Sequence, residues 1–374
     1  MITRRQFSIA AGTTALAGFP AVHAQGDRIV LGQSAAFTGP AAQLGIQFHA
    51  GAKLFFDRLN SEGGIGGRSI EIQQLDDGYE PERCADNTRK LIEQDVYCLF
   101  GYIGTPTSLA ALPLATKAKI PFVAPFTGAM GLRNPLNRYA FHVRASYNDE
   151  TALIVKQLHN LGLQKIAVFH QNDAYGKAGL DGVTLALAGL NNKPVATATV
   201  ERNSVEVAKA VETLIADAPD AIVQIGAYKA CAAFIRAARK AGYGGRFFNV
   251  SFVGTQALAD ELGKDGAGVV VSQVMPSPYN QSRPIAREFT EAVRKSAGKV
   301  SANFSSMEGY MAAKVLAEGM RRAGKTSRES LITGLESISN QSFGGFQVDF
   351  SATDHVASSF VELSMLTGDG RVRT

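Results

Sequence analysis

Short apolar runs alternate along most of this chain with longer segments whose apolar residues recur at helical spacing. The runs 28–37, 69–75 and 165–170 have the length of strands, whereas the segment 43–62 carries its apolar residues three or four positions apart, as an amphipathic helix does. Strands that alternate with helices in this way predict an α/β fold built on parallel sheets with right-handed crossovers.

The stretch 96–129 contains the clearest unit of this kind. An apolar run, 96–102, leads into an Ala/Leu-rich helix, where Pro106 suits the first turn and Thr105 is placed to be the N-cap. The free N–H groups at such a helix end bind anions, carboxylates included. A second strand, 120–124, ends in another small loop, so the two loops would meet at one crevice. The stretch predicts a grip for a small carboxylate, although an ordinary βαβ unit with a capping threonine would show the same pattern.

Composition and charge restrict the class of protein. The 374 residues are 45% hydrophobic and 19% charged, which is ordinary for a globular chain, and the length exceeds that of a single core, so two domains are expected. The formal net charge of +5 is spread among acidic residues without a basic run or basic-aromatic interleaving. Nucleic acid is therefore not expected as a partner.

The first residues, 1–24, are typical of an export signal. Arg4 and Arg5 precede a mildly apolar stretch, 8–22, and small residues around Ala24 offer a cleavage site. The Thr-Arg-Arg-Gln-Phe order resembles the twin-arginine motif, while a Sec signal with two ordinary arginines stays open. No later run approaches the roughly 18 apolar residues of a membrane span. We expect a soluble periplasmic protein whose signal is removed near Ala24.

The three cysteines leave at least one thiol unpaired in an oxidising compartment. Cys98 lies in an apolar strand and Cys231 in an alanine-rich helix, so both are expected to be small buried residues. A bridge between Cys84 and Cys98 stays open at this point.

Several motifs, in their order and spacing, carry a resemblance to a known family. They are AAFTGPAAQLG at 35–45, DRLNSEGGIGGRSIEI at 57–72, LDDGYEP at 75–81, GTPTS at 104–108, NDAYG at 172–176 and IGAY at 225–228. With these motifs the chain resembles the periplasmic leucine/isoleucine/valine-binding protein family, the substrate-binding components of ABC importers of the hydrophobic amino acid type. The resemblance covers nearly the whole mature chain.

The resemblance implies a type I periplasmic-binding-protein fold, in which two Rossmann-like lobes with parallel sheets are joined by three hinge crossovers and close on a ligand. It places lobe one at 27–145 plus 277–348 and lobe two at 146–276 plus 349–374. The disulfide that the family has in lobe one is not expected here, because Tyr79 occupies one of the two matching places. Gly104 occupies the other.

The resemblance also implies a set of ligand-binding positions on both lobes. They are Leu44, Thr105, Phe126, Thr127, Tyr175, Tyr228, Ser251 and Phe304. Thr105 and the loop of Phe126 and Thr127 would hold the α-carboxylate of the ligand, and Leu44 would present its side chain. The two tyrosines would close over the ligand from lobe two, unless they are surface aromatics beside loops. Phe304 would meet the apolar end of the ligand.

One position departs from the family pattern. Amino-acid binders place an acidic residue after the strand at 247–250 to pair with the α-ammonium, and Ser251 stands in that place here. A buried ammonium without a carboxylate partner costs several kcal/mol. Either another acid substitutes, with Asp173 the nearest by motif, or the ligand is an aromatic or short aliphatic carboxylate without an ammonium.

Two other classes of function have less support in the sequence. An enzyme would need a reactive constellation, yet the sequence holds no GxSxG, HExxH, CxxC or Walker motif, its six histidines form no ligand-spaced pair, and Asp76-Asp77 lacks a third metal ligand nearby. A ligand-sensing receptor on the same fold stays open. We therefore expect a non-enzymatic binding protein without cofactor or metal, a monomer that captures a small carboxylate and delivers it to an inner-membrane ABC permease.

Overall fold

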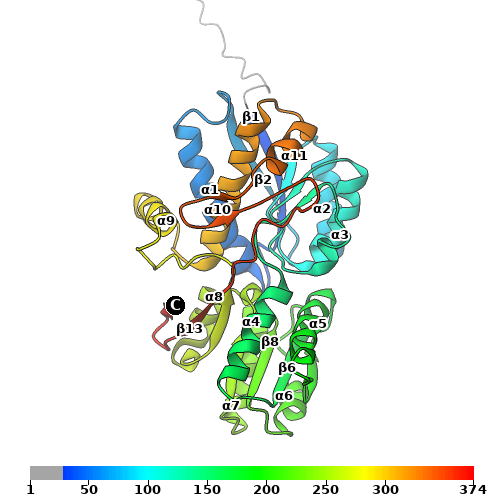
Figure 1. Ribbon diagram of the computed structural model, residues 1–374, viewed down its shortest axis with the longest axis vertical. Coiled ribbons are helices and arrows are strands. Elements are labelled where there is room, and N and C mark those ends of the chain that lie inside the picture. Colours follow the sequence, from blue (N-terminus) through cyan, green and yellow to red (C-terminus); the bar gives the residue numbers. More distant parts are fainter. Residues whose placement is uncertain (1–27) are drawn as a thin grey trace, which may run out of the picture.

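The computed structural model describes residues 28–374, and these form two α/β lobes that lie end to end (Figure 1). The predicted signal at 1–24 lies outside the described residues. Lobe one is built on a five-stranded sheet in the order β2-β1-β3-β4-β5, in which all neighbouring strands are parallel. Its strands are β1 (Arg28–Ala35), β2 (Ser69–Asp76), β3 (Cys98–Phe100), β4 (Phe122–Val123) and β5 (Ala140–Phe141).

Lobe two is built on a seven-stranded sheet in the order β14-β13-β10-β9-β8-β6-β7. The strands from β10 to β7 are parallel, and β13 and β14 extend the sheet in antiparallel fashion. They are β6 (Ile166–Gln171), β7 (Thr197–Val200), β8 (Ala221–Ile225), β9 (Arg246–Asn249), β10 (Val270–Gln273), β13 (Glu362–Leu366) and β14 (Val372–Arg373). A small hairpin pairs β11 (Gln341–Ser342) with β12 (Gln347–Val348).

Helices cover both sheets. In lobe one, α1 packs against α10, α10 against α11, and α2 against α3. In lobe two, α4 packs against α5, and α7 packs against both α6 and α8. Their bounds are α1 (Ala42–Ser61), α2 (Pro81–Glu93), α3 (Thr105–Lys117), α4 (Tyr147–Asn160), α5 (Ala174–Ala188), α6 (Ala208–Ile215), α7 (Tyr228–Lys240), α8 (Thr255–Leu262), α9 (Pro284–Lys295), α10 (Phe304–Ala323) and α11 (Arg328–Glu336).

The chain crosses between the lobes three times: between β5 and α4, between β10 and α9, and between β12 and β13. This confirms the expected fold class. The exact lobe boundaries stay a prediction. After β12 the chain still runs along lobe one, because His142 N donates to His355 O at 2.8 Å and Ala357 N donates to His142 O at 2.8 Å. These contacts favour a third crossing after Ala357 rather than at residue 349.

The loop before α3 differs from the sequence-based expectation at one residue. Gly104, with φ of +101°, is the N-cap, and Thr105 is the first helical residue, so the prediction of a Thr105 cap was wrong. A Cβ built on Gly104 would overlap the ring of Tyr79, so the chain needs glycine there for both its φ and the close approach. At the two places where the resemblance implies a disulfide in other members, an aromatic ring thus lies on a glycine. Pro106 lies in the first turn, as predicted.

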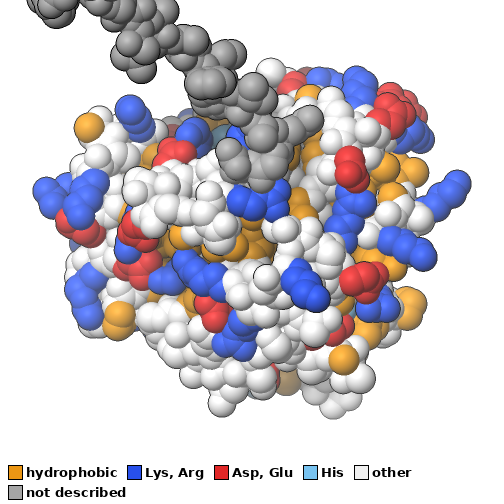
Figure 2. Space-filling model, turned by 90° about the horizontal axis from the view of Figure 1, so that it is seen from above, with side chains coloured by type: hydrophobic (Ala, Val, Ile, Leu, Met, Phe, Trp, Pro, Cys, Tyr) orange, Lys and Arg blue, Asp and Glu red, His pale blue; other side chains and the backbone are white. Residues whose placement is uncertain are grey.

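The three cysteines are free and buried, so the bridge between Cys84 and Cys98 is not formed. On the end of lobe one seen in Figure 2, Lys and Arg side chains are interspersed with Asp and Glu. Among the described helices, none is both long and apolar enough to cross a membrane.

Candidate functional site between the lobes

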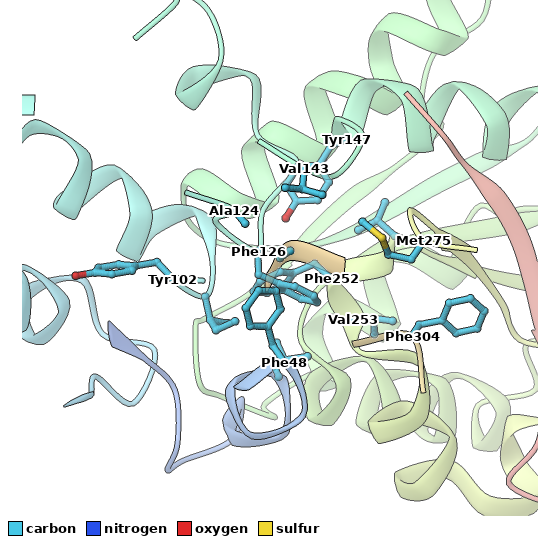
Figure 3. Close-up of a cluster of buried hydrophobic side chains, with 14 of the residues drawn as sticks. Phe48, Tyr102, Ala124, Phe126, Val143, Tyr147, Phe252, Val253, Met275 and Phe304 are labelled. Carbon is cyan, nitrogen blue, oxygen red and sulfur yellow. The ribbon is translucent and has the colours of Figure 1, made fainter. Parts of the chain in front are cut away.

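Aromatic side chains from both lobes meet where the loops after the strands face each other (Figure 3). Phe252, which follows β9 in lobe two, lies 4.5 Å from Tyr175 between ring centroids. The same ring lies 5.7 Å from Tyr79 and 5.7 Å from Phe126, both of lobe one. Phe126 also packs against Phe48 of α1. All of these rings are buried, so the lobes are in close contact here.

Three hydroxyl groups converge beside this cluster at the N-terminus of α3. Thr105 Oγ1 and Thr127 Oγ1 lie 2.7 Å apart, and both side chains are buried. The ring of Tyr147, the first residue of α4, lies against Gly128. Burial raises the pKa of Tyr147, and nearby Arg144 and the two threonine hydroxyls oppose the shift. Tyr147 Oη has no hydrogen-bond partner within residues 28–374. These groups have the chemistry to hold a carboxylate.

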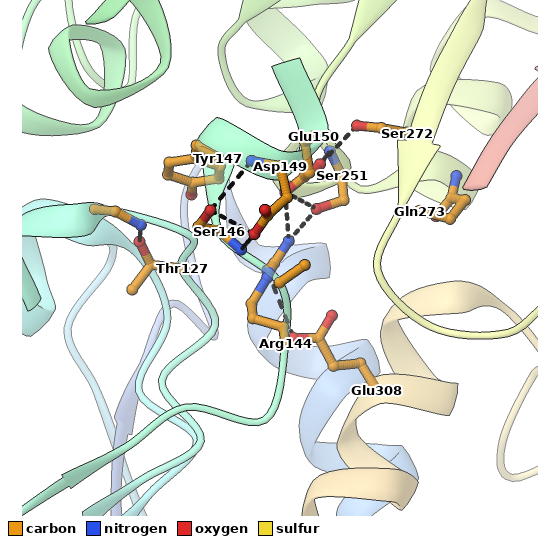
Figure 4. Close-up of polar contacts among 12 residues, drawn as sticks. Thr127, Arg144, Ser146, Tyr147, Asp149, Glu150, Ser251, Ser272, Gln273 and Glu308 are labelled. Carbon is orange, nitrogen blue, oxygen red and sulfur yellow. Dashed lines mark hydrogen bonds and ion pairs between the residues drawn. The ribbon is translucent and has the colours of Figure 1, made fainter. Parts of the chain in front are cut away.

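A buried cation stands on the first crossover between the lobes (Figure 4). Arg144 is 1% exposed, and its Nη2 lies 3.4 Å from Glu150 Oε1 and hydrogen-bonds to Ser251 Oγ. Its Nη1 lies 3.5 Å from Glu308 Oε1 of α10. The guanidinium also stacks 4.7 Å from the centroid of Phe126. Burial alone would lower the pKa of Arg144, but Glu308 and Glu150 outweigh this and raise it. Arg144 thus joins acids of both lobes.

Glu150 is the acid beside Ser251, and its oxygens are occupied. Glu150 Oε2 accepts from Ser251 N at 2.7 Å and from Ser272 Oγ at 2.6 Å. Glu150 Oε1 accepts from Ser251 Oγ at 3.0 Å and faces Arg144. The suggestion that Asp173 takes this place is not supported by the geometry. Asp173 is the N-cap of α5, where it accepts from two backbone N–H groups.

A second buried acid and a second buried cation lie close by. Burial raises the pKa of Glu308 to about 7, although Arg144 opposes the shift. Arg133 Nη2 donates to the carbonyl oxygens of Thr127, Arg144 and Ala145 at 3.0–3.3 Å, which fixes the crossover backbone. Burial lowers the pKa of Arg133 to about 10, with Arg144 contributing.

The remaining predicted positions lie at different parts of the contact between the lobes. A Cβ built on Gly254 of lobe two would overlap the side chain of Leu44, so Leu44 faces that loop directly. Tyr228 Oη accepts from Gln43 N of lobe one at 3.4 Å, so this buried tyrosine also contacts the other lobe. Phe304 packs 6.0 Å from Tyr279 and points away from the aromatic cluster (Figure 3).

The structure therefore brings together Thr105, Phe126, Thr127, Tyr175 and Ser251 of the predicted set. It adds residues that sequence reasoning did not single out as ligand-binding, which are Tyr79, Arg133, Arg144, Tyr147, Glu150, Phe252 and Glu308. Glu150 carried one weak signal, since an acid in the first turn after Ser146 fits a helix start. Nothing in the local pattern around Arg144 or Glu308 indicated that they would meet.

Two parallel-sheet lobes, three crossovers and a buried polar site at the carboxyl ends of the strands define a bilobal binding protein. The sequence profile of the periplasmic binding protein family matches residues 28–370. The chain belongs to this family, and its relatives place it with the leucine/isoleucine/valine-binding type.

Three comparisons illustrate the relationship. A leucine-, isoleucine-, valine-, threonine- and alanine-binding protein of Pseudomonas aeruginosa is 23% identical over 86% of this chain and 85% of its own. The crystal structure of a possible leucine/isoleucine/valine-binding protein from Rhodopirellula baltica superposes with a TM-score of 0.90, at 33% identity over 95% of this chain and 98% of that one. A fatty acid ABC transporter substrate-binding protein from Thermomonospora curvata shares the fold, with a TM-score of 0.84 at 21% identity over 92% and 90% of the two chains.

Proposed function

We propose that this protein is the extracytoplasmic solute-binding component of an ABC importer and that it captures a small carboxylate between its lobes. The observation that carries the proposal is the convergence of the Thr105, Thr127 and Tyr147 hydroxyls at the start of α3, in a buried site lined by both lobes. A carboxylate oxygen would accept from these hydroxyls and from the N–H groups of the helix end.

Capture would work by population shift. Contacts from Tyr175 and Phe252 of lobe two and from Phe126 of lobe one exist together only when the lobes meet, so a ligand that touches both sides favours the closed form. The permease would recognise the closed, ligand-bound form. We propose a role without catalysis, in the periplasm and as a monomer, with the signal of residues 1–24 removed.

The names of the relatives suggest a branched-chain or hydrophobic amino acid as the ligand. The same importer role with a carboxylate that lacks an ammonium is the first alternative. The second is a periplasmic receptor that senses its ligand through a partner protein. Permease and ATPase genes beside this gene would favour import, and a histidine kinase gene would favour sensing.

A thermal-shift panel on the purified protein tests the proposal. It compares leucine, phenylalanine and glutamate with benzoate, 4-hydroxybenzoate and short keto acids. A ligand at about 100 times its Kd adds roughly 2.7 kcal/mol to the free energy of unfolding, which raises Tm by a few degrees. The absence of a shift with every carboxylate would overturn the proposed function.

A further inference from the structure

Hydrogen-bond donors without partners gather around the first crossover. Arg144 Nε and Nη1 and Arg133 Nε and Nη1 have no hydrogen-bond partner in the described part of the chain, and neither do Tyr147 Oη and Tyr175 Oη. Arginine N–H groups can only donate. An unpaired buried donor costs about 1–3 kcal/mol. These unpaired donors would therefore be satisfied by a ligand group that accepts hydrogen bonds. A carboxylate accepts hydrogen bonds, and an ammonium does not.

Glu150, the acid beside Ser251, has no free acceptor site for a cationic group. Glu150 has roughly four lone-pair sites as a carboxylate. Its two oxygens already receive Ser251 N, Ser251 Oγ and Ser272 Oγ and face Arg144. The amide oxygens of Gln224 and Asn249 are also unpaired, but these residues lie on β8 and β9, where their amide nitrogens bond to backbone carbonyls of lobe two.

We propose that Arg144 sets the ligand class, and that the solute is a carboxylate without an ammonium group. The inference rests on the proposed function and narrows it. The guanidinium hydrogen-bonds to Ser251, at the place where the family resemblance leads us to expect an acid for an ammonium, and the acid that does lie beside Ser251, Glu150, is already engaged by Arg144 and the serine. An incoming carboxylate would take the Nε donor of Arg144 together with the hydroxyls of Tyr147 and Tyr175, and would compete with Glu308 for Nη1.

Within the described part of the chain, Glu308 is the nearby carboxylate that could compete for an ammonium. It is 5% exposed, and within residues 28–374 its charged partner is Arg144, at 3.5 Å. An α-ammonium bound to Glu308 would therefore stand next to the like charge of Arg144, which disfavours the charged form. An amino acid would therefore need Glu308 to outweigh Arg144 near its ammonium, whereas a carboxylate without an ammonium would be attracted by Arg144.

Matched ligand pairs test the inference on the unaltered protein. Leucine is compared with 4-methylpentanoate and phenylalanine with 3-phenylpropanoate by titration calorimetry, after any bound ligand has been removed by dialysis in denaturant and refolding. Each pair differs only in the amino group. We expect the ammonium-free member of at least one pair to bind on the order of 100-fold more tightly. Tighter binding of the amino acids would overturn the inference and leave the proposed function standing, whereas binding of no carboxylate would overturn both.

Variants then assign the role to Arg144. Arg144→Gln should weaken binding of the preferred carboxylate by on the order of 100-fold, while Arg138→Gln, an exposed arginine paired with Glu329 on lobe one, should leave it unchanged. Circular dichroism and thermal unfolding check that each variant folds. If Arg144→Gln does not fold, the ligand pairs on the unaltered protein decide, and tighter binding of leucine and phenylalanine there would contradict the inference. Unchanged affinity in a folded Arg144→Gln would do the same.

Discussion

Thr105 Oγ1 and Thr127 Oγ1 lie 2.7 Å apart, although one begins α3 and the other lies in the loop that follows β4. Because β3 and β4 are parallel neighbours, the loops after them emerge at the same edge of the sheet. The hydroxyl pair is buried, and Thr127 Oγ1 also accepts from Ala129 N at 3.2 Å. The two loops are thus held together at the position where we propose that a carboxylate binds.

Replacing Thr105 by valine should weaken ligand binding. The change keeps the shape and removes one hydroxyl, so we expect about a tenfold loss of affinity and a loss of about 1 kcal/mol of stability from the broken hydrogen bond between the two hydroxyls. Thr107→Val is the matched control, since Thr107 Oγ1 is buried but donates to carbonyls of its own turn. Calorimetric titration and denaturant unfolding measure both. Equal affinity losses in the two variants would contradict the assignment.

Gly254 should matter for closure through its contact with Leu44. Alanine there would overlap the Leu44 side chain of the other lobe, so we expect Gly254→Ala to lower ligand affinity about tenfold by holding the lobes apart. Adding Leu44→Ala should recover part of that loss. Gly268→Ala is the control for backbone strain, because Gly268 has the same φ of +79° and no neighbour within 4 Å of a built Cβ. Equal affinity in the Gly254 and Gly268 variants would rule out the closure effect.

An ion pair at the rim of the contact between the lobes should favour the closed form slightly. Arg202 Nη2 lies 2.9 Å from Glu80 Oε2, and Asn203 Nδ2 donates to Glu80 Oε1 at 2.7 Å. The side chains are 25% and 40% exposed, so solvent screens the pair and we expect Arg202→Ala to lower affinity only about twofold, less at high salt. Arg28→Ala breaks a 2.8 Å pair within lobe one and should leave affinity unchanged. A salt-independent loss would contradict the electrostatic account.

Glu308 should make stability depend on pH. Its pKa is about 7 in the folded protein against an ordinary 4.5, so the folded state keeps a proton that the unfolded chain has lost. The stabilisation is fully present below about pH 4.5 and is lost as the pH rises through about 7, by on the order of 3 kcal/mol. Glu308→Gln should remove this decline in denaturant unfolding measured from pH 4.5 to 8. Glu329→Gln, at an exposed pair, should not. Parallel profiles for wild type and Glu308→Gln would show that the pKa is not raised.

The alternation of apolar runs and amphipathic segments was sufficient to predict the fold class. Strand and helix periods are local properties, because each element must bury one face whatever its neighbours are. The same local patterns placed Pro106 in a first helical turn. The prediction of a Thr105 cap was wrong because the cap position has a positive φ and lies against the Tyr79 ring, so it is occupied by Gly104. Neither the φ nor the contact can be seen in the sequence.

The sequence by itself determined the alternation of strands and helices, the loops that carry the hydroxyls and the serine at position 251. Only the tertiary structure decided that Arg144, Glu150 and Glu308, which come from a crossover and two helices, meet beside that serine. Their meeting depends on how the lobes pack and not on any local period, so no pattern along the chain contains it. Burial then makes pairing necessary, because a charge removed from water is costly unless it pairs with an opposite charge of the protein or of a ligand.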